Sequence, residues 1–279
     1  MTYGRSWILV DKKISSRRQE YLTQLRHRKY LVWTARLGLL AVFFALWELS
    51  ARLGWIDAFI LSSPCRIGKT LADLYKTGEL WLHLGTSCLE TVVGFLLGTA
   101  AGALVAVALW LSPTLYSVLD PYLVVLNSLP KTALGPVFIV WMGAGPGAII
   151  AMTLAISLVV TILEIHNGFL STDVGKLRLL QSLGATKRQI LFKVVIPANF
   201  TTIINALKVN VGLSWVGVIM GEFLVSRAGL GYLIVYGSQV FKMDLVMATV
   251  LLLALAAAGM YQGILLLEKV LKKHLGVSS

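Results

Sequence analysis

The stretch SLGATKRQILFKVVIP, residues 182–197, separates two long apolar regions of the chain and carries three cations. Gly184 lies near its start and Pro197 at its end. Glycine commonly ends a helix in the left-handed conformation, and a threonine such as Thr186 can cap the start of the next one. We therefore expect two short helices with Gly184 between them. Pro197, which suits the first turn of a helix, is expected to begin the apolar helix that follows.

Both short helices are predicted to have one apolar face. At the start of the first helix, the Asp173 carboxylate complements the helix dipole, and leucines then recur about one turn apart. These leucines are Leu177, Leu180 and Leu183, and the second helix has Ile190, Leu191, Val194 and Val195 on one side. An apolar face beside exposed cations is typical of a surface that docks into a partner's groove.

Composition places most of the chain in lipid. Of its 279 residues, 57% are hydrophobic and 14% are charged, whereas a soluble domain carries about 25% charged residues. Runs of roughly 20 apolar residues are long enough to cross a bilayer. Such runs predict an all-α polytopic membrane protein with about six transmembrane helices, at 31–51, 88–111, 115–142, 147–169, 198–224 and 245–268.

The cations indicate how these spans are oriented. The chain has 25 Lys and Arg residues and a net charge of +12. Eight of these cations lie in residues 1–30, five in 171–197 and three in 269–273. Six crossings bring all three clusters to one side, and basic loops stay in the cytoplasm, so both termini are predicted to be cytoplasmic. No basic stripe interleaved with aromatic residues lies on a soluble domain, so a nucleic-acid partner is not expected.

The third span contains two prolines, Pro130 and Pro136, with Asn127 and Lys131 close to the first. Proline removes a helical hydrogen bond and leaves a carbonyl that protein or water must satisfy. One interpretation is a broken helix that lines a solute path, since a lysine within the membrane usually faces a polar cavity or partner. The other interpretation is a span that begins later, with Lys131 reaching the membrane interface.

Two further features of the spans indicate packing or gating. Gly94, Gly98 and Gly102 form a row at helical spacing, which allows two helix backbones to approach closely. Glu222 lies near the end of the fifth span, directly after a glycine, and an ionisable residue in lipid is by default a functional hypothesis. Two roles for Glu222 remain open, an outer gate and a structural cap.

The sequence has no pattern typical of an enzyme. The tripeptide GKT at 68–70 resembles the end of a phosphate-binding loop, but that motif requires glycine where Ser63 stands. The chain lacks the G-x-S-x-G motif of a nucleophilic serine, and its four histidines have no metal-ligand spacing. Cys65 and Cys88 lack such spacing too, and nothing requires a disulfide between them. We expect no catalytic residue, metal or cofactor in this chain.

Residues 178–197 resemble the coupling loop of ABC-importer permeases, in which E-A-A, three residues and a glycine precede nine residues and I-x-L-P. Gly184 aligns with that glycine, and the sequence VVIP at 194–197 follows after nine residues. The sequence RLL at 178–180 stands where the family has E-A-A. The missing glutamate leaves open whether Arg178 contacts an acidic group of the ATPase instead.

Three other stretches resemble the same family in the expected order. They are SSPCRIGKTL (62–71), LNSLPKTALGPVFIVWMGAG (126–145) and GLSWVGVIMGEFLVSRAGLGYLI (212–234). Together the matches cover roughly residues 60–270 and resemble the nitrate, sulfonate and taurine subgroup of binding-protein-dependent permeases. The resemblance implies a MetI-like ABC-importer permease fold in the cell inner membrane. The expected parts are a cytoplasmic basic segment (1–30), a first transmembrane helix (31–55), an extracytoplasmic or interfacial connection (56–87), a permease core (88–270) containing the coupling loop (171–197), and a cytoplasmic tail (271–279).

The resemblance also implies partners and site residues. A second permease chain, expected to be identical, would complete the pathway in the membrane lipid, and two ATPase subunits, which use ATP and Mg, would bind the coupling loops. An extracytoplasmic solute-binding protein would deliver the solute, and ATPase closure would drive alternating access. The implied ATPase-coupling residues are Arg178, Leu179, Leu180, Leu183, Gly184, Ala185, Thr186, Lys187 and Pro197. The implied translocation-pathway residues are Asn127, Pro130, Lys131, Trp215 and Glu222.

The subgroup resemblance favours a small oxyanion as the solute, such as an aliphatic sulfonate, taurine, nitrate or bicarbonate. Lys131 and Lys208 would suit an anion pathway. The same machinery importing a thiamine-pyrimidine or flavin-type compound is the alternative. A self-contained secondary transporter would be expected to contain an inverted repeat, which is not evident, and a mere membrane anchor would need neither Pro130 nor an intramembrane lysine.

Overall fold

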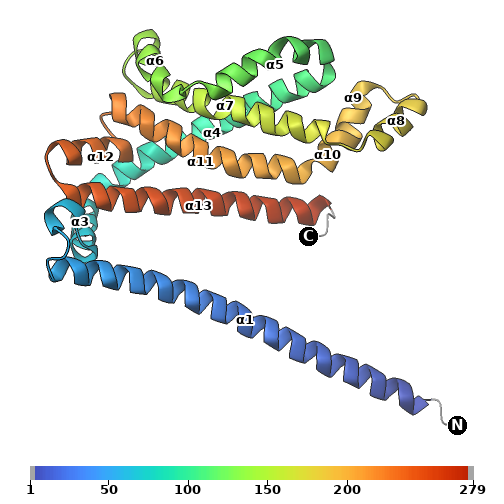
Figure 1. The fold of residues 1–279 in the computed structure, drawn as a ribbon, viewed down its shortest axis with the longest axis horizontal. Helices are drawn as coiled ribbons and strands as arrows, with labels where there is room; N and C mark the ends of the chain where they lie inside the picture. Colours follow the sequence, from blue (N-terminus) through green and yellow to red (C-terminus); the bar gives the residue numbers. More distant parts are fainter. Residues whose placement is uncertain (1–3, 276–279) are drawn as a thin grey trace. The chain divides into compact units, whose positions relative to one another are not determined.

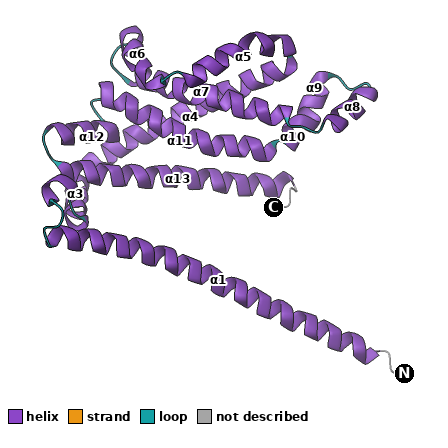
Figure 2. Ribbon diagram, in the orientation of Figure 1, coloured by secondary structure: helices purple, strands orange, loops and turns teal. Residues whose placement is uncertain are grey.

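The computed structural model of this protein describes residues 4–275, and every regular element in that range is a helix (Figure 1, Figure 2). Side chains are described from Tyr21 to Lys273, apart from residues 22, 25, 26 and 29. The chain divides into two units, residues 1–66 and 67–279. The first unit contains α1 (Gly4–Arg52), α2 (Ala58–Leu61) and the start of α3 (Pro64–Thr77). The second contains α4 (Glu79–Leu111), α5 (Pro113–Ser128), η1 (Lys131–Leu134), α6 (Gly135–Met142), α7 (Pro146–Leu170), α8 (Val174–Ser182), α9 (Lys187–Ile190), η2 (Leu191–Val195), α10 (Ile196–Ala198), α11 (Phe200–Val225), α12 (Leu230–Gln239) and α13 (Met243–Leu275).

The number of spans agrees with the sequence prediction. Among the described residues, five stretches are long and apolar enough to cross a membrane, and a bent helix pair provides a sixth if it counts as one span. The five stretches are Tyr30–Arg52, Glu79–Leu111, Pro146–Leu170, Phe200–Val225 and Met243–Lys273, and the bent pair is Pro113–Ser128 with Lys131–Met142. The protein is therefore an all-α polytopic membrane protein, as expected.

Several boundaries differ from those predicted. α4 begins at Glu79, so the second span starts well before residue 88. The polar residues His83 and Ser87 obscured this start in the sequence, but both are buried and hydrogen-bonded to a distant helix. α1 is one helix from Gly4, without a backbone break near residue 30. In the predicted tail at 271–279, α13 extends to Leu275, and residues 276–279 lie outside the described range.

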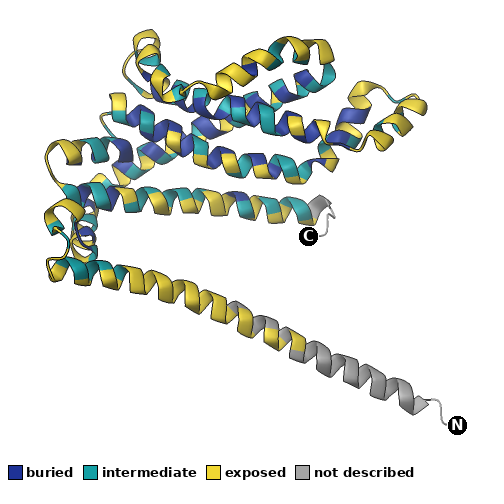
Figure 3. Cartoon of the chain, in the orientation of Figure 1, coloured by how far each residue is buried: buried dark blue, intermediate teal, exposed yellow. Residues whose placement is uncertain are grey.

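α7 is the central helix of the second unit and contacts α4, α5, α6 and α11. Figure 3 shows buried residues concentrated along these packed helices. The predicted glycine row of α4 faces α7. A Cβ atom added at Gly94, Gly98 or Gly102 would lie only 2.6–2.7 Å from the nearest side-chain atom of Thr153, Ser157 or Thr161, respectively. The row therefore permits the close helix packing that the sequence predicts.

α11 approaches α7 from another side in the same way. A Cβ atom at Gly217 would lie 2.5 Å from Cα of Thr153, and one at Gly221 would lie 2.9 Å from Cα of Ile149. Thr153 thus packs between Gly94 of α4 and Gly217 of α11, and its hydroxyl donates to the Ile149 carbonyl one turn earlier, at 2.9 Å. Because this internal bond satisfies the hydroxyl, a polar side chain can fill the apolar junction of the three helices.

The third predicted span is broken, as one of the two interpretations required. α5 ends at Ser128, and the helical pair that follows turns away by 90°. Nζ of Lys131 donates to the backbone carbonyl of Asn127 at 3.0 Å. A cation at this position complements the negative end of the α5 dipole and pairs one of its last free carbonyls. The broken helix is therefore confirmed, whereas its contact with a solute stays a prediction.

Candidate functional site

The segment of residues 171–197, here called the coupling segment, contains α8 and α9, which lie at one end of the second unit (Figure 1). The Asp173 side chain accepts a hydrogen bond from the backbone N–H of Gly175 at 2.7 Å and so caps the start of α8. Gly184 ends α8 with φ +80°, in the left-handed conformation. The prediction of a left-handed C′ glycine is thus confirmed.

The end of α8 is a Schellman motif. The N–H of Ala185 donates to the Leu180 carbonyl and that of Gly184 donates to the Gln181 carbonyl, both at 3.0 Å. Ala185 and Leu180 both pack against one apolar cluster, which is the hydrophobic contact that accompanies this motif. The backbone hydrogen bonds that form the corner between the two helices therefore come from neighbouring residues.

Thr186 caps α9, as predicted, and the cap is reciprocal. The Gln189 N–H donates to Oγ1 of Thr186 at 3.3 Å, while the Thr186 N–H donates to Oε1 of Gln189 at 2.8 Å. This arrangement is a capping box, which satisfies two free N–H groups at the start of a helix. The sequence T-x-x-Q carries this signal directly.

Pro197 does not begin the next long helix, which corrects the prediction. It lies in the short α10, and α11 starts at Phe200. Just before it, Leu191–Val195 forms a π-helical turn, in which the Ile196 N–H bonds to the Leu191 carbonyl. Proline lacks an N–H and its ring clashes with the carbonyl four residues earlier. The widened turn accommodates Pro197 without ending the chain's helical path.

The coupling segment is anchored on the helices behind it. Ile190, Leu191 and Val195 are fully or almost fully buried, and they pack with Ala106, Ile165, Phe169 and Ala206 from three longer helices. Nδ2 of Asn199, two residues after the coupling segment, donates to Oγ1 of Thr172 at 2.7 Å and so ties the chain beyond the segment to its start. Motion of this segment would therefore act directly on α4, α7 and α11.

The opposite side of the coupling segment is exposed and carries both apolar and positively charged side chains. Leu179 and Leu183 are 62% and 74% exposed. Leu183 was expected to share the apolar face of Leu177 and Leu180, but those two are partly buried in the cluster whereas Leu183 points away from it. The exposed cations are Lys176, Arg178, Lys187, Arg188 and Lys193. Two free leucines among five cations form a surface suited to a partner with apolar and acidic groups.

The predicted pathway residues do not form one cluster. Asn127 and Pro130 are exposed at the α5 break, and Lys131 is partly buried there. Trp215 is 5% exposed and packs with Phe95, so it lies inside the protomer. A pathway role for these residues stays a prediction, and the burial of Trp215 favours a packing role.

Lys208 is not a free cation, which corrects the expectation that it suits an anion pathway. Its Nζ lies 2.8 Å from a carboxylate oxygen of Glu268 on α13, and Lys272 lies 2.8 Å from the other oxygen. The side chains of Lys208 and Glu268 are 19% and 13% exposed. This ion pair joins α11 to α13 and leaves Lys131 as the remaining predicted pathway cation.

A second polar site was not predicted from the sequence. His83, Ser87 and Glu222 together cap the N-terminus of α12, and this group is here called the α12 cap. Nδ1 of His83 accepts from the Gly229 N–H at 3.0 Å, and Oγ of Ser87 accepts from the Leu230 N–H at 2.7 Å. The Glu222 carboxylate accepts from the N–H group of Gly231, at 2.5 Å. Three of the four N–H groups that a helix start leaves free are thereby paired.

The two glycines at this helix start give the Glu222 side chain room. Gly229 has φ +113°, and a Cβ atom there would overlap the Glu222 carboxyl group. A Cβ atom on Gly231 would lie 2.7 Å from Cβ of Glu222. Glu222 is therefore a structural cap, one of the two roles that the sequence left open. One sequence feature could have predicted this site. It is the set of polar residues on one face of a helix, at positions 83, 87 and 90.

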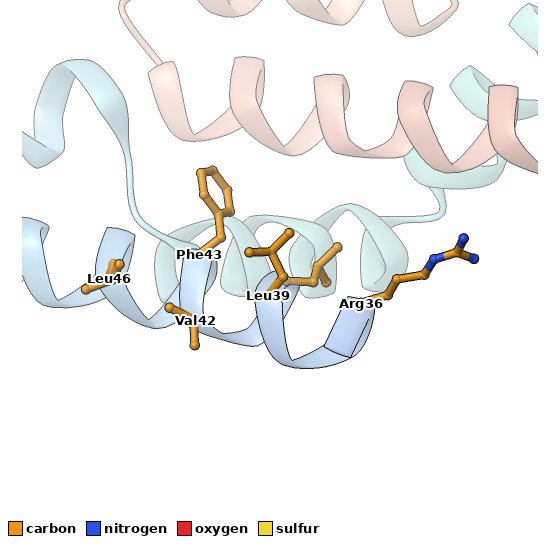
Figure 4. Close-up of a pocket in the computed structure, with 6 residues that line it drawn as sticks. Arg36, Leu39, Val42, Phe43 and Leu46 are labelled. Atoms are coloured by element: carbon orange, nitrogen blue, oxygen red, sulfur yellow. The ribbon is translucent and has the colours of Figure 1, made fainter. Parts of the chain in front are cut away.

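The pocket shown in Figure 4 lies on α1 and contains none of the predicted site residues. It is lined by Arg36, Leu39, Leu40, Val42, Phe43 and Leu46. All six residues belong to the membrane-spanning part of α1, and five are apolar. A surface of this kind suits lipid contact rather than recognition of a polar solute.

Comparisons with known proteins agree with this architecture. The model of the family described as binding-protein-dependent transport system inner membrane component matches residues 96–275. The putative aliphatic sulfonates transport permease protein SsuC of Bacillus subtilis is 29% identical, over 88% of this chain and 89% of its own length. The taurine transport system permease protein TauC of Escherichia coli is 27% identical, over 94% and 96%.

A solved structure has the same fold. A chain of the MetNI methionine ABC transporter, in an inward-facing conformation, superposes with a TM-score of 0.53 and 20% sequence identity. The match covers 66% of this chain and 97% of that chain. The MetI-like fold that the sequence predicts is therefore confirmed. The chain belongs to the family of binding-protein-dependent transport system inner membrane components and is an ABC-importer permease of the inner membrane.

Proposed function

We propose that this permease, with a second copy of itself, forms the pathway through which an ATP-driven importer moves a small oxyanion. The coupling segment is the proposed docking surface for an ATPase subunit, and two such subunits bind ATP and Mg. A solute-binding protein delivers the solute from outside the membrane. The observation that carries the proposal is the pair of exposed leucines, Leu179 and Leu183, on a segment whose other side is anchored in the helix core.

The geometry supports a mechanical role for this segment. Its inner face packs on residues of α4, α7 and α11, and its outer face is free. A partner that grips the outer face and moves would therefore transmit that motion to three spans at once. Rigid-body movement of packed helices between discrete states is the expected form of alternating access.

The proposed orientation places both termini and the coupling segment in the cytoplasm. The three clusters of Lys and Arg, at 1–30, 171–197 and 269–273, support this orientation through the positive-inside rule. In a chain whose Cys65 and Cys88 are replaced by serine, a cysteine introduced at exposed Leu183 is expected to react with a membrane-impermeant maleimide in inside-out vesicles and not in intact cells. Labelling in intact cells instead would reverse the orientation.

Two observations support a small oxyanion as the solute, the similarity to sulfonate and taurine permeases and the position of Lys131. The sulfonate and taurine permeases align over nearly the whole chain, and Lys131 places a positive group at the break in the third span. The formylaminopyrimidine and riboflavin transport permeases among the relatives favour a vitamin-type solute as the second candidate. The first candidate is an aliphatic sulfonate, taurine, nitrate or bicarbonate.

Reconstitution in liposomes tests the function. The chain, its ATPase and its binding protein are incorporated together, and uptake of labelled taurine, hexanesulfonate, nitrate, bicarbonate, riboflavin and a formylaminopyrimidine is measured with and without ATP. We expect uptake of one of the oxyanions that requires ATP and all three components. Uptake of riboflavin or the pyrimidine alone would establish the second candidate, and uptake without the ATPase would identify a secondary transporter.

Arg178 occupies the position at which the coupling loop of ABC-importer permeases has glutamate. A charge reversal at this position tests its role. If the exposed Arg178 pairs with an acidic group on the ATPase, Arg178→Glu is expected to weaken ATPase binding by roughly 10- to 150-fold, since charge-assisted contacts contribute about 1.5–3 kcal/mol. Lys176→Glu, at a neighbouring exposed cation, is the matched control. Unchanged or stronger binding by Arg178→Glu would mean that arginine is merely tolerated there.

A further inference from the structure

Glu90 of α4 is a buried carboxyl group that the coupling segment does not use. It is 7% exposed, and one of its oxygens, Oε2, has no hydrogen-bond partner among the described residues. Ser87, one turn before Glu90 on the same face of α4, has its Oγ 2.5 Å from Oε1 of Glu222, so the Glu90 carboxyl group lies beside that of Glu222, which is 1% exposed. Two carboxyl groups that lie close together away from water cannot both be ionised at low cost, so one of them is expected to hold a proton. The hydrogen-bond partners of each group indicate which one it is.

The donors around Glu222 determine its charge state. The Ser87 hydroxyl accepts from the Leu230 N–H at 2.7 Å, so its own hydrogen is free to point at Oε1 of Glu222, 2.5 Å away. The N–H group of Gly231 donates to the other oxygen of the same carboxylate. A hydroxyl and an N–H group thus offer hydrogens to Glu222. An ionised carboxylate only accepts hydrogen bonds, so this environment fits Glu222 as an anion at the positive end of the α12 dipole.

The contact between the two carboxyl groups then needs a hydrogen from the other side. Glu90 is the remaining group that can supply it, and a neutral carboxylic acid has one O–H donor. Its unpartnered oxygen becomes a neutral carbonyl, which costs less to leave unpaired in a protein interior than a charged oxygen. We propose that Glu90 is a protonated carboxylic acid that donates to the Glu222 carboxylate, so that one bound proton joins α4, α11 and the start of α12.

The neighbouring groups are compatible with this assignment. Nδ1 of His83 accepts from the Gly229 N–H, so this nitrogen carries no proton. On α7, the uncharged side chains of Ile149 and Thr153 pack on Gly221, next to Glu222 in α11, and on Gly94, one turn after Glu90 in α4. The other titratable side chains nearby are Cys88 on α4 and Tyr232 on α12, whose ring stacks on His83. None of the contacts described here brings a cation to the two carboxyl groups, so the shared proton is what offsets their repulsion.

Infrared spectroscopy of the purified full-length chain in detergent tests the assignment. A protonated carboxyl group has a carbonyl stretching band separate from the bands of carboxylates, and wild type minus Glu90→Gln is expected to show this band as a loss. Glu79→Gln, which removes an exposed carboxyl group at the start of the same helix, is expected to leave the band unchanged. An undiminished band in Glu90→Gln would overturn the proposal, and a band that disappears in Glu222→Gln instead would place the proton on Glu222.

Thermal unfolding provides a second readout that a merely space-filling role would not give. A glutamine amide at position 90 can still donate to Glu222, so Glu90→Gln is expected to keep the wild-type melting temperature. Glu90→Leu, of similar size without a donor, is expected to lower it by several degrees. Equal melting temperatures for the Gln and Leu variants would contradict the hydrogen bond from Glu90. Both measurements are independent of the transported solute and of the ATPase, so their outcome is separate from that of the proposed function.

Discussion

Helix ends in the coupling segment and at α12 are stabilised in contrasting ways. In the coupling segment the caps come from within a few residues, as in the reciprocal bonds of Thr186 and Gln189. At α12 most of the caps come from far away in the chain, since His83 lies 146 residues before Gly229. Local caps allow the coupling segment to keep its shape while one side stays exposed. Distant caps instead fasten α12 to two membrane-spanning helices, so its position depends on theirs.

The largest loss of stability is expected from a substitution at the start of α12. Gly231→Val places a side chain 2.7 Å from Cβ of Glu222 and 3.0 Å from the Ile219 carbonyl. Overpacking costs about 1–3 kcal/mol and a lost hydrogen bond to a buried carboxylate a similar amount, so we expect a loss near 3 kcal/mol. Thermal unfolding in detergent measures it. Gly212→Val is the control, because a Cβ atom at Gly212 meets nothing within 4 Å, and equal melting temperatures for the two variants would refute the close contact.

A smaller loss is expected when one member of the α12 cap is removed. Ser87→Ala leaves the Leu230 N–H without its acceptor and Glu222 without a donor, at a cost of about 1–3 kcal/mol. Hydrogen exchange should accelerate at the first amides of α12 in particular. Thr86→Ala is the matched control, because the Thr86 hydroxyl bonds only to the Leu82 carbonyl of its own helix. Equal protection of α12 in both variants would mean that Ser87 does not anchor it.

Substitution at Gly184 tests the local side of the comparison. A β-branched residue at φ +80° is strained by about 1–2 kcal/mol, so Gly184→Val is expected to distort the corner between α8 and α9. We expect pull-down of the ATPase to fall severalfold while membrane insertion is unchanged. Gly184→Asn should retain binding, since asparagine tolerates the left-handed conformation. ATPase recovery at the wild-type level by the valine variant would exclude a coupling role for this corner.

The smallest effect is expected from Thr186→Ala. Loss of the cap costs about 1 kcal/mol, and the change is confined to α9 because the capping box is local. Amide exchange should accelerate at Gln189 and Ile190, with little change in the overall melting temperature. A fall in melting temperature as large as that of Ser87→Ala would show that the coupling segment is not locally stabilised.

The same contrast explains what the sequence could predict. Gly184, Thr186 and the break near Pro130 follow from local chemistry, and the structure confirms each of them. The α12 cap and the early start of α4 were missed because His83 and Ser87 look like interruptions of an apolar run until their distant partners are known. The π-helical turn before Pro197 was missed because several backbone arrangements can accommodate a proline.

The sequence predicted that the glycine row of α4 packs closely against another helix, but not which helix that is. A row of small residues indicates close packing but does not name the helix that fills it. The structure supplies α7, and it adds Gly217 and Gly221 of α11, a shorter pair at the same four-residue spacing that the prediction did not include. For the solute pathway, burial of Trp215 could not be foreseen from the motif that contains it. The sequence was therefore a better guide to the helix caps than to the positions of individual pathway residues.

The central position of α7 makes it a lever arm. Its 25 residues span about 37 Å at 1.5 Å per residue, and it leads at one end directly into the coupling segment. Thr153, packed between Gly94 and Gly217, leaves no space for α7 to slide against its neighbours. A tilt of about 10° over that length displaces one end relative to the other by about 6 Å. A small rotation imposed on the coupling segment would thus be amplified, at the far end of the bundle, to the dimensions of a small anion.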